Sequence, residues 1–384
     1  MKLKKLSILR LYLSYCLLAT LILYGCITEY EAKDIDEFSD ILVVEGFITD
    51  SLSTIKVTRS VSLSNEQRNS TNVNDAIVYV ERDDDLIWEA TNNLFGRYTL
   101  RIGDLDPDRK YRLRILIEEP DSDCVSETPC PLKIHEYCTD FSSPIITPQI
   151  DSVFYMKRGL GQPVTIHIST RASDIETQYF RWSFKEDWEI NADYFIYGYP
   201  YYCWNTDTNT EIMLGSADNT VLGQITEKMI EINPSNLKLS VLYRINIEQN
   251  AISKDAYNYF SNIKKNAKEI GSIFAPVPSE LQSNIKCITN PSKIVIGFVE
   301  VGTTSYGELY ISGEEVYESA VTLDCRIISE EELRGMYPGD PGRPWFPPAT
   351  YILVTSSGYN AYILHRCVDC TFEGTRRRPE NWPE

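Results

Sequence analysis

Short β-prone runs separated by turn residues dominate most of the chain, and they limit the folds that it can adopt. Val, Ile, Thr and Tyr are frequent in these runs. In "AIVYVER", Ile77 and Tyr79 alternate with Val78 and Val80, as the two faces of a strand require. Long helical periodicity is scarce and no repeat of fixed period is evident. The pattern predicts a mainly β protein, and a chain of 384 residues suits two domains.

The first domain is predicted at residues 41–141. It begins with "ILVVEGFITD", and towards its end "GRYTLRI" is followed by "DLDPDRKYRLRI", a turn leading into a strand. These two patterns resemble the closing strands of carboxypeptidase-regulatory-like or immunoglobulin-like sandwiches, so we expect a small β-sandwich. The stretch "FSSPIITPQIDSV" (141–153), with two prolines and few charges, is the predicted domain junction.

The second domain is predicted at residues 150–384 as a β-rich unit with one amphipathic helix near residues 253–269. Ser253 can cap this helix and Gly271 can end it. Apolar residues recur between them at helical spacing, namely Ala256, Tyr259, Phe260, Ile263 and Ala267. We expect the helix to lie against the second sheet.

The N-terminus has the pattern of a bacterial lipoprotein signal. Residues 1–25 combine a positively charged start with an apolar run, and Gly25 directly precedes Cys26. Leu23 to Cys26 resemble a lipobox, although Tyr24 is bulkier than usual there, so we predict removal of residues 1–25 and lipidation of Cys26. A membrane helix with an incidental cysteine is the alternative.

Residues 26–40 are predicted to form an acidic tether without a core of its own. In lipoproteins of the Bacteroidota, acidic residues directly after the lipidated cysteine resemble the signal for export to the outer leaflet. We therefore expect a lipid-anchored outer-membrane protein exposed at the cell surface. The periplasmic leaflet is the alternative location.

The charge of the chain disfavours some partners. The formal net charge is −18, and it becomes −22 without residues 1–25, which hold four cations and no acid. Nucleic acids and anionic lipid headgroups carry the same sign, so neither is an expected partner. Acidity of this size mainly supports solubility, or attraction of cationic ligands.

Eight cysteines remain beyond Cys26, an even number in a chain that is predicted to be exported. Such a count favours disulfides, and the sequence cannot choose among the pairings. We expect one local bridge among the first three cysteines, with the others bridging the second half of the chain. The eight candidates are Cys124, Cys130, Cys138, Cys203, Cys287, Cys325, Cys367 and Cys370.

No motif predicts a cofactor, a metal site or a catalytic centre. His365, Cys367 and Cys370, with Cys325, could hold zinc, but export favours their oxidation. The stretch "DLDPD" (104–108) has the first spacings of a calcium loop and lacks its later ligands, so we interpret it as a turn.

A nucleophile would need a base and an orienting acid, yet none of the three histidines (His135, His167 and His365) lies in a familiar nucleophile motif. The prediction is a non-enzyme, although a carboxylate pair for glycoside cleavage stays open among 55 acidic residues.

The tract "DYFIYGYPYYCWN" (193–205) is the candidate partner or ligand surface. Gly198 and Pro200 make it a predicted loop rather than an ordinary strand. Tyrosine offers a large contact area with a polar end at a small entropic cost. Core packing, a protein interface and a carbohydrate or small-ligand platform all remain open for its rings, which are Tyr194, Phe195, Tyr197, Tyr199, Tyr201, Tyr202 and Trp204.

The C-terminal "GTRRRPENW" (374–382) places three arginines in a strongly acidic chain. They could pair with carboxylates of the protein or of a partner, or form a solvated tail. Trp382 is predicted to pack onto the sheet.

The order and spacing of several segments resemble the Bacteroidota lipoprotein family of domain-of-unknown-function 4249 over residues 26–384. The segments around Cys124, Cys130 and Cys138 are not matched. The landmarks are "LVVEGFITD", "VTRSVSL", "YFRWSFKEDWEI", "SKDAYNYFSNIKKNAKEIGSIFAPVPSELQSNI", "IVIGFVEVG" and "CVDCTFEGTRRRPENWP".

The resemblance implies a cell-envelope lipoprotein that accompanies a TonB-dependent outer-membrane barrel, and it supplies no catalytic residues. The expected function is a surface-exposed, non-catalytic accessory subunit of that transporter, acting as a lid, in docking or in substrate capture. The alternative is a stand-alone cell-surface adhesin or glycan-binding module.

Overall fold

The computed structural model describes residues 40–61, 71–120, 131–173, 177–218, 220, 223–269, 283–318, 325–339, 344–356 and 359–383. The predicted signal peptide, the predicted lipidation site Cys26 and the predicted tether up to residue 39 lie outside these ranges, as do Cys124 and Cys130. The chain divides into two compact units, residues 1–41 with 59–71 and residues 42–58 with 72–384. The second unit holds the sheets described below, and the protein is mainly β, as predicted.

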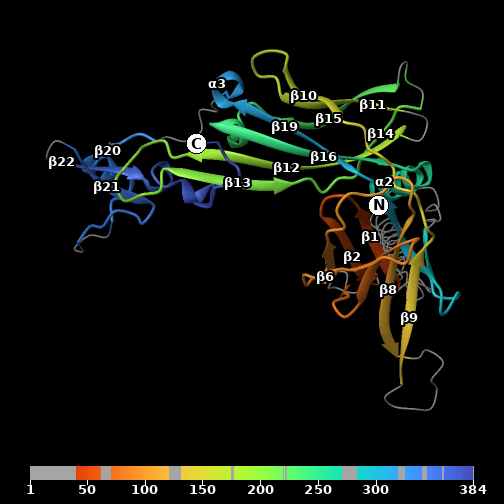
Figure 1. The fold of residues 1–384 in the computed structure, drawn as a ribbon. Helices are drawn as coiled ribbons and strands as arrows, with labels where there is room; N and C mark the ends of the chain where they lie inside the picture. The colour runs from red at the N-terminus through yellow and green to blue at the C-terminus, as the bar shows by residue number, and fades with distance from the viewer. Residues whose placement is uncertain are drawn as a thin grey trace, which may run out of the picture. The chain divides into compact units, whose positions relative to one another are not determined.

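Two sheets form the predicted N-terminal β-sandwich (Figure 1). One has the order β18-β1-β2-β7-β6 with β3 beside β2, and the other has the order β17-β9-β8-β4-β5. The strands of the first sheet are β1 (Leu42–Ile48), β2 (Ser53–Arg59), β3 (Thr71–Asn72), β6 (Thr91–Asn92), β7 (Arg97–Leu100) and β18 (Val295–Val301). Those of the second are β4 (Ile77–Arg82), β5 (Ile87–Glu89), β8 (Tyr111–Pro120), β9 (Leu132–Thr139) and β17 (Ile285–Cys287).

The alternating pattern of these strands explains the core between the two sheets. Val78 and Val80 are fully buried, whereas Ile77 is exposed, as the period of two requires. They pack in one cluster with Val44, Ile55 and other apolar residues of both sheets.

The N-terminal sandwich is completed from the far part of the chain, which corrects the predicted domain boundaries. The strands β17 and β18 lie within residues 150–384, which the sequence assigns to the second domain. The strand β18 nevertheless pairs in parallel with β1, and β17 pairs antiparallel to β9. Parallel partners need a long crossover connection, so local sequence patterns do not reveal them.

A second pair of sheets, called the middle sheets below, is formed by residues between 150 and 312. One has the order β10-β11-β15, and the other has the order β13-β12-β16-β19 with β14 beside β12. The strands are β10 (Ile150–Lys157), β11 (Val164–Arg171), β15 (Gln224–Ile232), β12 (Tyr179–Asn191), β13 (Tyr202–Thr208), β14 (Met213–Ser216), β16 (Leu242–Ile252) and β19 (Thr304–Ser312). A buried cluster that includes Ile166, Trp182 and Ile245 joins the two sheets, and the short helices η3 (Leu237–Leu239) and α3 (Gly313–Val316) flank it.

The predicted helix is α2 (Lys254–Glu269). The Ser253 hydroxyl accepts from the Ala256 N–H at 3.1 Å and so caps the first turn, as expected. Tyr259 and Phe260 pack with Phe298 of β18 and with residues of β12 and β14. The helix therefore lies against the β12–β16 sheet of the predicted second domain, as expected. It also contacts strand β18 of the N-terminal sandwich.

The last part of the chain forms a small C-terminal module, defined here as the described residues between 325 and 375. Its sheet has the order β20-β22-β21. The elements are β20 (Ile328–Ser329), α4 (Glu330–Met336), β21 (Tyr351–Ser356), β22 (Tyr359–Leu364), η4 (His365–Cys367) and η5 (Cys370–Phe372). No helix in the described part of the chain is both long and apolar enough to cross a bilayer.

Candidate partner surface

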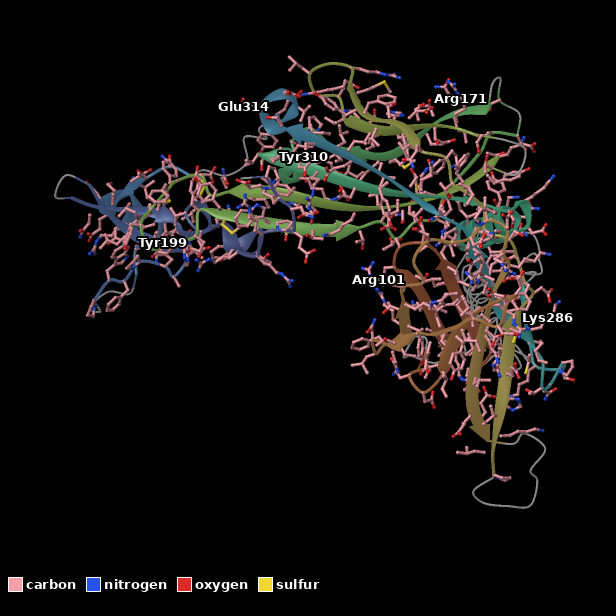
Figure 2. The ribbon with its side chains drawn as sticks, in the orientation of Figure 1. Arg101, Arg171, Tyr199, Lys286, Tyr310 and Glu314 are labelled. Carbon is pink, nitrogen blue, oxygen red and sulfur yellow. A yellow bond between two sulfur atoms is a disulfide. The ribbon has the colours of Figure 1, made fainter. Side chains whose placement is uncertain are left out.

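The first part of the aromatic tract, up to Tyr201, forms the predicted loop between β12 and β13, whereas Tyr202 to Asn205 belong to strand β13. We define residues 192–201, together with the first strand residue Tyr202, as the aromatic loop. The Ala192 N–H donates to the Tyr201 carbonyl at 2.9 Å and closes the base of the loop. Two further backbone bonds of 3.0 Å, from Tyr194 to the Cys367 carbonyl and from Cys370 to the Pro200 carbonyl, join the loop to the C-terminal module. Figure 2 shows Tyr199 among the side chains of this module.

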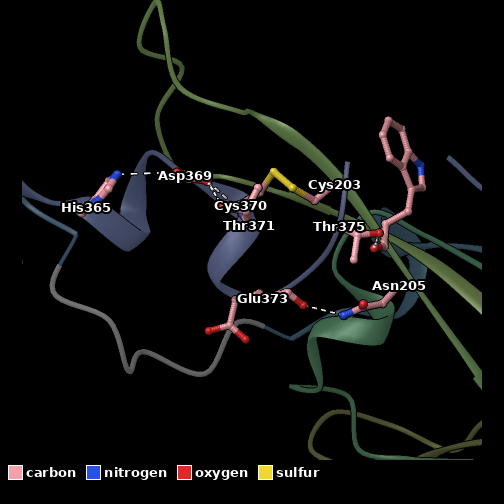
Figure 3. The surroundings of a disulfide bond; sticks show 9 residues. Cys203, Asn205, His365, Asp369, Cys370, Thr371, Glu373 and Thr375 are labelled. Carbon is pink, nitrogen blue, oxygen red and sulfur yellow. Dashed lines mark hydrogen bonds and ion pairs between the residues drawn. A yellow bond between two sulfur atoms is a disulfide. The ribbon is translucent and has the colours of Figure 1, made fainter. Parts of the chain in front are cut away.

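Two disulfides lie at the same junction, and one of them crosses it. Cys203 at the start of β13 is bonded to Cys370 in η5 (Figure 3), and Cys325 is bonded to Cys367 in η4. The Cys203–Cys370 bridge spans 167 residues of sequence, so it ties the end of the chain to the middle sheet. Beside it, Trp204 and Thr375 exchange two backbone hydrogen bonds of 2.8 Å. The expectation that cysteines bridge the second half of the chain is confirmed for these four.

The other two described cysteines are free thiols, which corrects their assignment to disulfides. Cys138 on β9 and Cys287 on β17 are both buried. Cys138 lies opposite Lys286 and Cys287 lies opposite Tyr137. This one-residue offset places the two sulfurs on opposite faces of the sheet. Burial raises the pKa of Cys138 to about 11, so its thiol is protonated and unreactive at neutral pH.

The two disulfides also leave no thiolate among the cysteines that could have bound zinc, namely Cys325, Cys367 and Cys370. The carboxylate of Asp193 lies close to the sulfurs of Cys325 and Cys367. Both sulfurs belong to one disulfide, and zinc binds the thiolate form of cysteine. His365 instead faces Asp369, at 3.5 Å between Nε2 and Oδ2 (Figure 3).

The rings of the tract divide between packing and exposure. Tyr199 is half-buried, stacks edge-to-face on His365 and packs on the apolar cluster around Cys367. Tyr201 packs beside the Cys203–Cys370 bridge, and Trp204 is half-buried. The exposed rings are Tyr194 (39%), Phe195 (71%), Tyr197 (95%) and Tyr202 (55%).

Core packing therefore holds for part of the tract, and its packed rings fix the loop. For the exposed rings, the protein interface and the ligand platform stay predictions. Phe372 of η5 adds a 58% exposed ring that the sequence analysis did not single out, and this ring contacts His365.

The C-terminal residues lie across the polar face of the β12–β16 sheet. The ring of Trp382 is buried beneath the Arg244 guanidinium, and its Nε1 donates to Glu189 at 3.2 Å. Arg244 also donates to the backbone carbonyls of Glu380 and Asn381. The expected packing of Trp382 onto the sheet is confirmed, whereas the side chains of Arg376, Arg377 and Arg378 are exposed.

A buried ion pair supports this attachment. Arg244 and Asp187 are 4% and 0% exposed, and their charged atoms lie 2.7 Å apart. Burial raises the pKa of Asp187, but hydrogen bonds from Thr206 and Arg244 and the charge of Lys185 outweigh it, so the net pKa lies below its usual range. Removal of one partner from such a pair costs about 3–5 kcal/mol. No sequence motif pointed to this pair.

The two other histidines and the "DLDPD" stretch are each held by contacts within the fold. His135 is buried near Glu119 and Thr289, and His167 stacks on Phe154 of β10. The carboxylate of Asp106 accepts from the Asp108 N–H at 3.0 Å, which supports the interpretation of "DLDPD" as a turn.

The sequence matches the profile of a known protein family. The sequence profile of the family described as domain of unknown function (DUF4249) matches residues 27–307, well over half of the chain. No curated protein shows a significant match. The matched range covers the N-terminal sandwich, helix α2, the aromatic tract itself and the middle sheets up to the first residues of β19, and it ends before the C-terminal module. The chain therefore belongs to the DUF4249 family.

Proposed function

We propose that the protein is a lipid-anchored outer-membrane protein, displayed at the cell surface, that serves as a non-catalytic accessory subunit of a TonB-dependent transporter. The observation that supports this most is the exposed aromatic surface of the loop, which we define as Tyr194, Phe195, Tyr197 and Tyr202. Aromatic rings are enriched at protein interfaces. Burial of such exposed rings against a partner removes apolar surface from water, which favours binding.

The attachment of this surface fits a docking role. Packed rings, backbone hydrogen bonds and two disulfides hold the base of the loop, so little entropy is lost when the exposed rings bind. Disulfides also accord with an exported location. The predicted lipidation site Cys26 supplies the proposed anchor.

The test is co-purification from native outer membranes in mild detergent, with a tag placed after Glu384. We expect a TonB-dependent transporter in near-equal amount by mass spectrometry. The double substitution Phe195→Ala with Tyr197→Ala should lower its recovery at least about tenfold, because both rings are mostly exposed. Phe195 contacts Tyr201 edge-to-face, and the packing of Tyr199 on His365 is not touched by either substitution.

The matched control is Phe346→Ala, which removes a 77% exposed ring in the C-terminal module and should leave recovery unchanged. Recovery of the lipoprotein without any transporter would contradict the proposal. Equal recovery by the double variant would contradict the assignment of the aromatic surface.

A further inference from the structure

A ladder of polar side chains follows the face of β16 and β19 that points away from the core. Four residues on each strand stand opposite one another in the register. With about 3.3 Å per residue, the ladder is about 20 Å long. We define this polar ladder as Arg244, Asn246, Glu248 and Asn250 of β16 with Thr304, Tyr306, Glu308 and Tyr310 of β19.

Two adjacent hollows open over the polar ladder. One has a volume of about 500 Å³ and the other about 440 Å³. Glu248 and Tyr306 line both, so the hollows meet at this pair. Glu380 and Asn381 of the C-terminal residues form part of the wall of the larger hollow. Figure 2 shows Tyr310 on strand β19 of the β12–β16 sheet.

The polar groups of the ladder are held in place before any ligand binds. With its amide oriented so that nitrogen faces the Glu308 carboxylate and oxygen faces Arg244, Asn246 donates to Glu308 at 3.0 Å and accepts from Arg244 Nε at 3.3 Å. The Asn250 amide donates to the Thr304 hydroxyl at 2.8 Å. Fixed donors and acceptors lose little conformational entropy on binding, which favours recognition of a ligand with many hydrogen-bonding groups.

The central ring is fixed as well. Tyr306 is 56% exposed, and its hydroxyl donates to the Ser51 side chain at 2.9 Å. An exposed ring in the middle of a polar groove offers a flat apolar surface between hydrogen-bonding groups. A sugar ring has the complementary chemistry, with C–H groups on its faces and hydroxyls at its edge.

The lining argues against other ligand classes. Glu248, Glu308 and Glu380 offset the cations Lys185, Arg244 and Arg101 across the two hollows, so an anionic ligand meets as many acids as bases. An extended peptide prefers an unpaired strand edge or pockets for alternate side chains, whereas the hollows lie over the face of a sheet.

We propose that the polar ladder binds a neutral oligosaccharide, with Tyr306 stacking on a sugar ring and Asn246, Glu248 and Asn250 bonding its hydroxyls. This site is separate from the aromatic surface. It would serve capture of a glycan whether or not a transporter is attached.

The test is isothermal titration calorimetry of the full chain in mild detergent with hexasaccharides of the cello-, manno-, xylo- and malto- series. At least one series should bind. Tyr306→Ala and Glu248→Ala should each weaken that binding about tenfold or more, because each removes a contact shared by both hollows. Tyr337→Ala, which removes a 46% exposed tyrosine in the C-terminal module, should leave the affinity within about twofold of the wild type.

Circular dichroism must show equal folding of the variants. Absence of binding to all four series would overturn the proposal, as would sugar binding that survives both Tyr306→Ala and Glu248→Ala. Binding of uncharged hexapeptides in place of the sugars would overturn the ligand class. The titration uses the isolated protein and tests the polar ladder, whereas co-purification tests the aromatic surface. Failure of the sugar proposal is therefore distinguishable from failure of the transporter proposal.

Discussion

Single residues at the contact between helix α2 and strand β18 have properties that their sequence neighbours do not indicate. Glu300 of β18 receives a hydrogen bond from the Ser253 hydroxyl, which also caps α2. Burial raises the pKa of Glu300 to about 7, and nearby Asp255 adds to this shift, while hydrogen bonds from Ser253 oppose it. The residue therefore changes charge near neutral pH.

The stability of the protein should depend on pH through Glu300. Its folded pKa of about 7 exceeds its ordinary value of 4.5, so the folded state binds the proton more tightly. The resulting stabilisation is complete below pH 4.5 and is lost as the pH rises to about 7. Glu300→Gln should raise the free energy of unfolding at pH 8 by on the order of 2 kcal/mol and have almost no effect at pH 4.

Urea unfolding of wild type and variant across this range measures the difference. Glu314→Gln changes an exposed carboxylate on α3, and its profile should run parallel to that of the wild type. A constant effect of Glu300→Gln at every pH would show that the charge of this carboxyl does not matter.

Among the elements, β18 shows how a strand far along the chain completes the first sandwich. It pairs in parallel with β1, and Gly297 lies opposite Val44. The φ angle of Gly297 is +149°, and a Cβ atom there would lie 1.9 Å from the Val44 carbonyl oxygen. The close approach of the two backbones therefore requires glycine at this position.

Gly297→Ala should lower the free energy of unfolding by more than about 2 kcal/mol, because the two strands must separate to admit the methyl group. Gly335→Ala in helix α4 is the matched control. Its Cβ would meet no atom within 4 Å, so that variant should be neutral or slightly stabilised. Denaturant unfolding compares the two, and equal stability of both variants would contradict the proposed constraint.

At the scale of the whole molecule, the Cys203–Cys370 disulfide attaches the C-terminal module to β13, whereas the Cys325–Cys367 disulfide lies within the module. The Cys203–Cys370 bridge closes a far longer loop than the Cys325–Cys367 bridge, with sequence separations of 167 and 42. Longer loops lose more entropy in the unfolded state when they are closed. The longer bridge should therefore contribute more to stability.

The double substitution Cys203→Ala with Cys370→Ala should cost about 2–4 kcal/mol and remove protection from hydrogen exchange in β20 to β22. The cost of Cys325→Ala with Cys367→Ala should be smaller. Hydrogen exchange followed by mass spectrometry measures both effects. Unchanged protection of these strands in the first variant would show that packing alone attaches the module.

The sequence by itself determined the features of the fold that depend only on residues close together in the chain. Alternation predicted the mainly β fold, because burial of one strand face is a local pattern of period two. Capping by Ser253 and apolar spacing predicted α2 for the same reason. The exposed and packed rings of one aromatic loop, by contrast, could not be separated in advance, because their partners lie about 170 residues further along the chain in the C-terminal module.

Only the tertiary structure decided the long-range partners. It placed β18 beside β1, selected two cysteine pairs and left Cys138 and Cys287 on opposite faces of a sheet. It also brought Asp187 and Arg244 together beneath the C-terminal residues. Each of these contacts depends on which segments meet in space, and a period of two or 3.6 residues carries no information about a partner that lies tens of residues away.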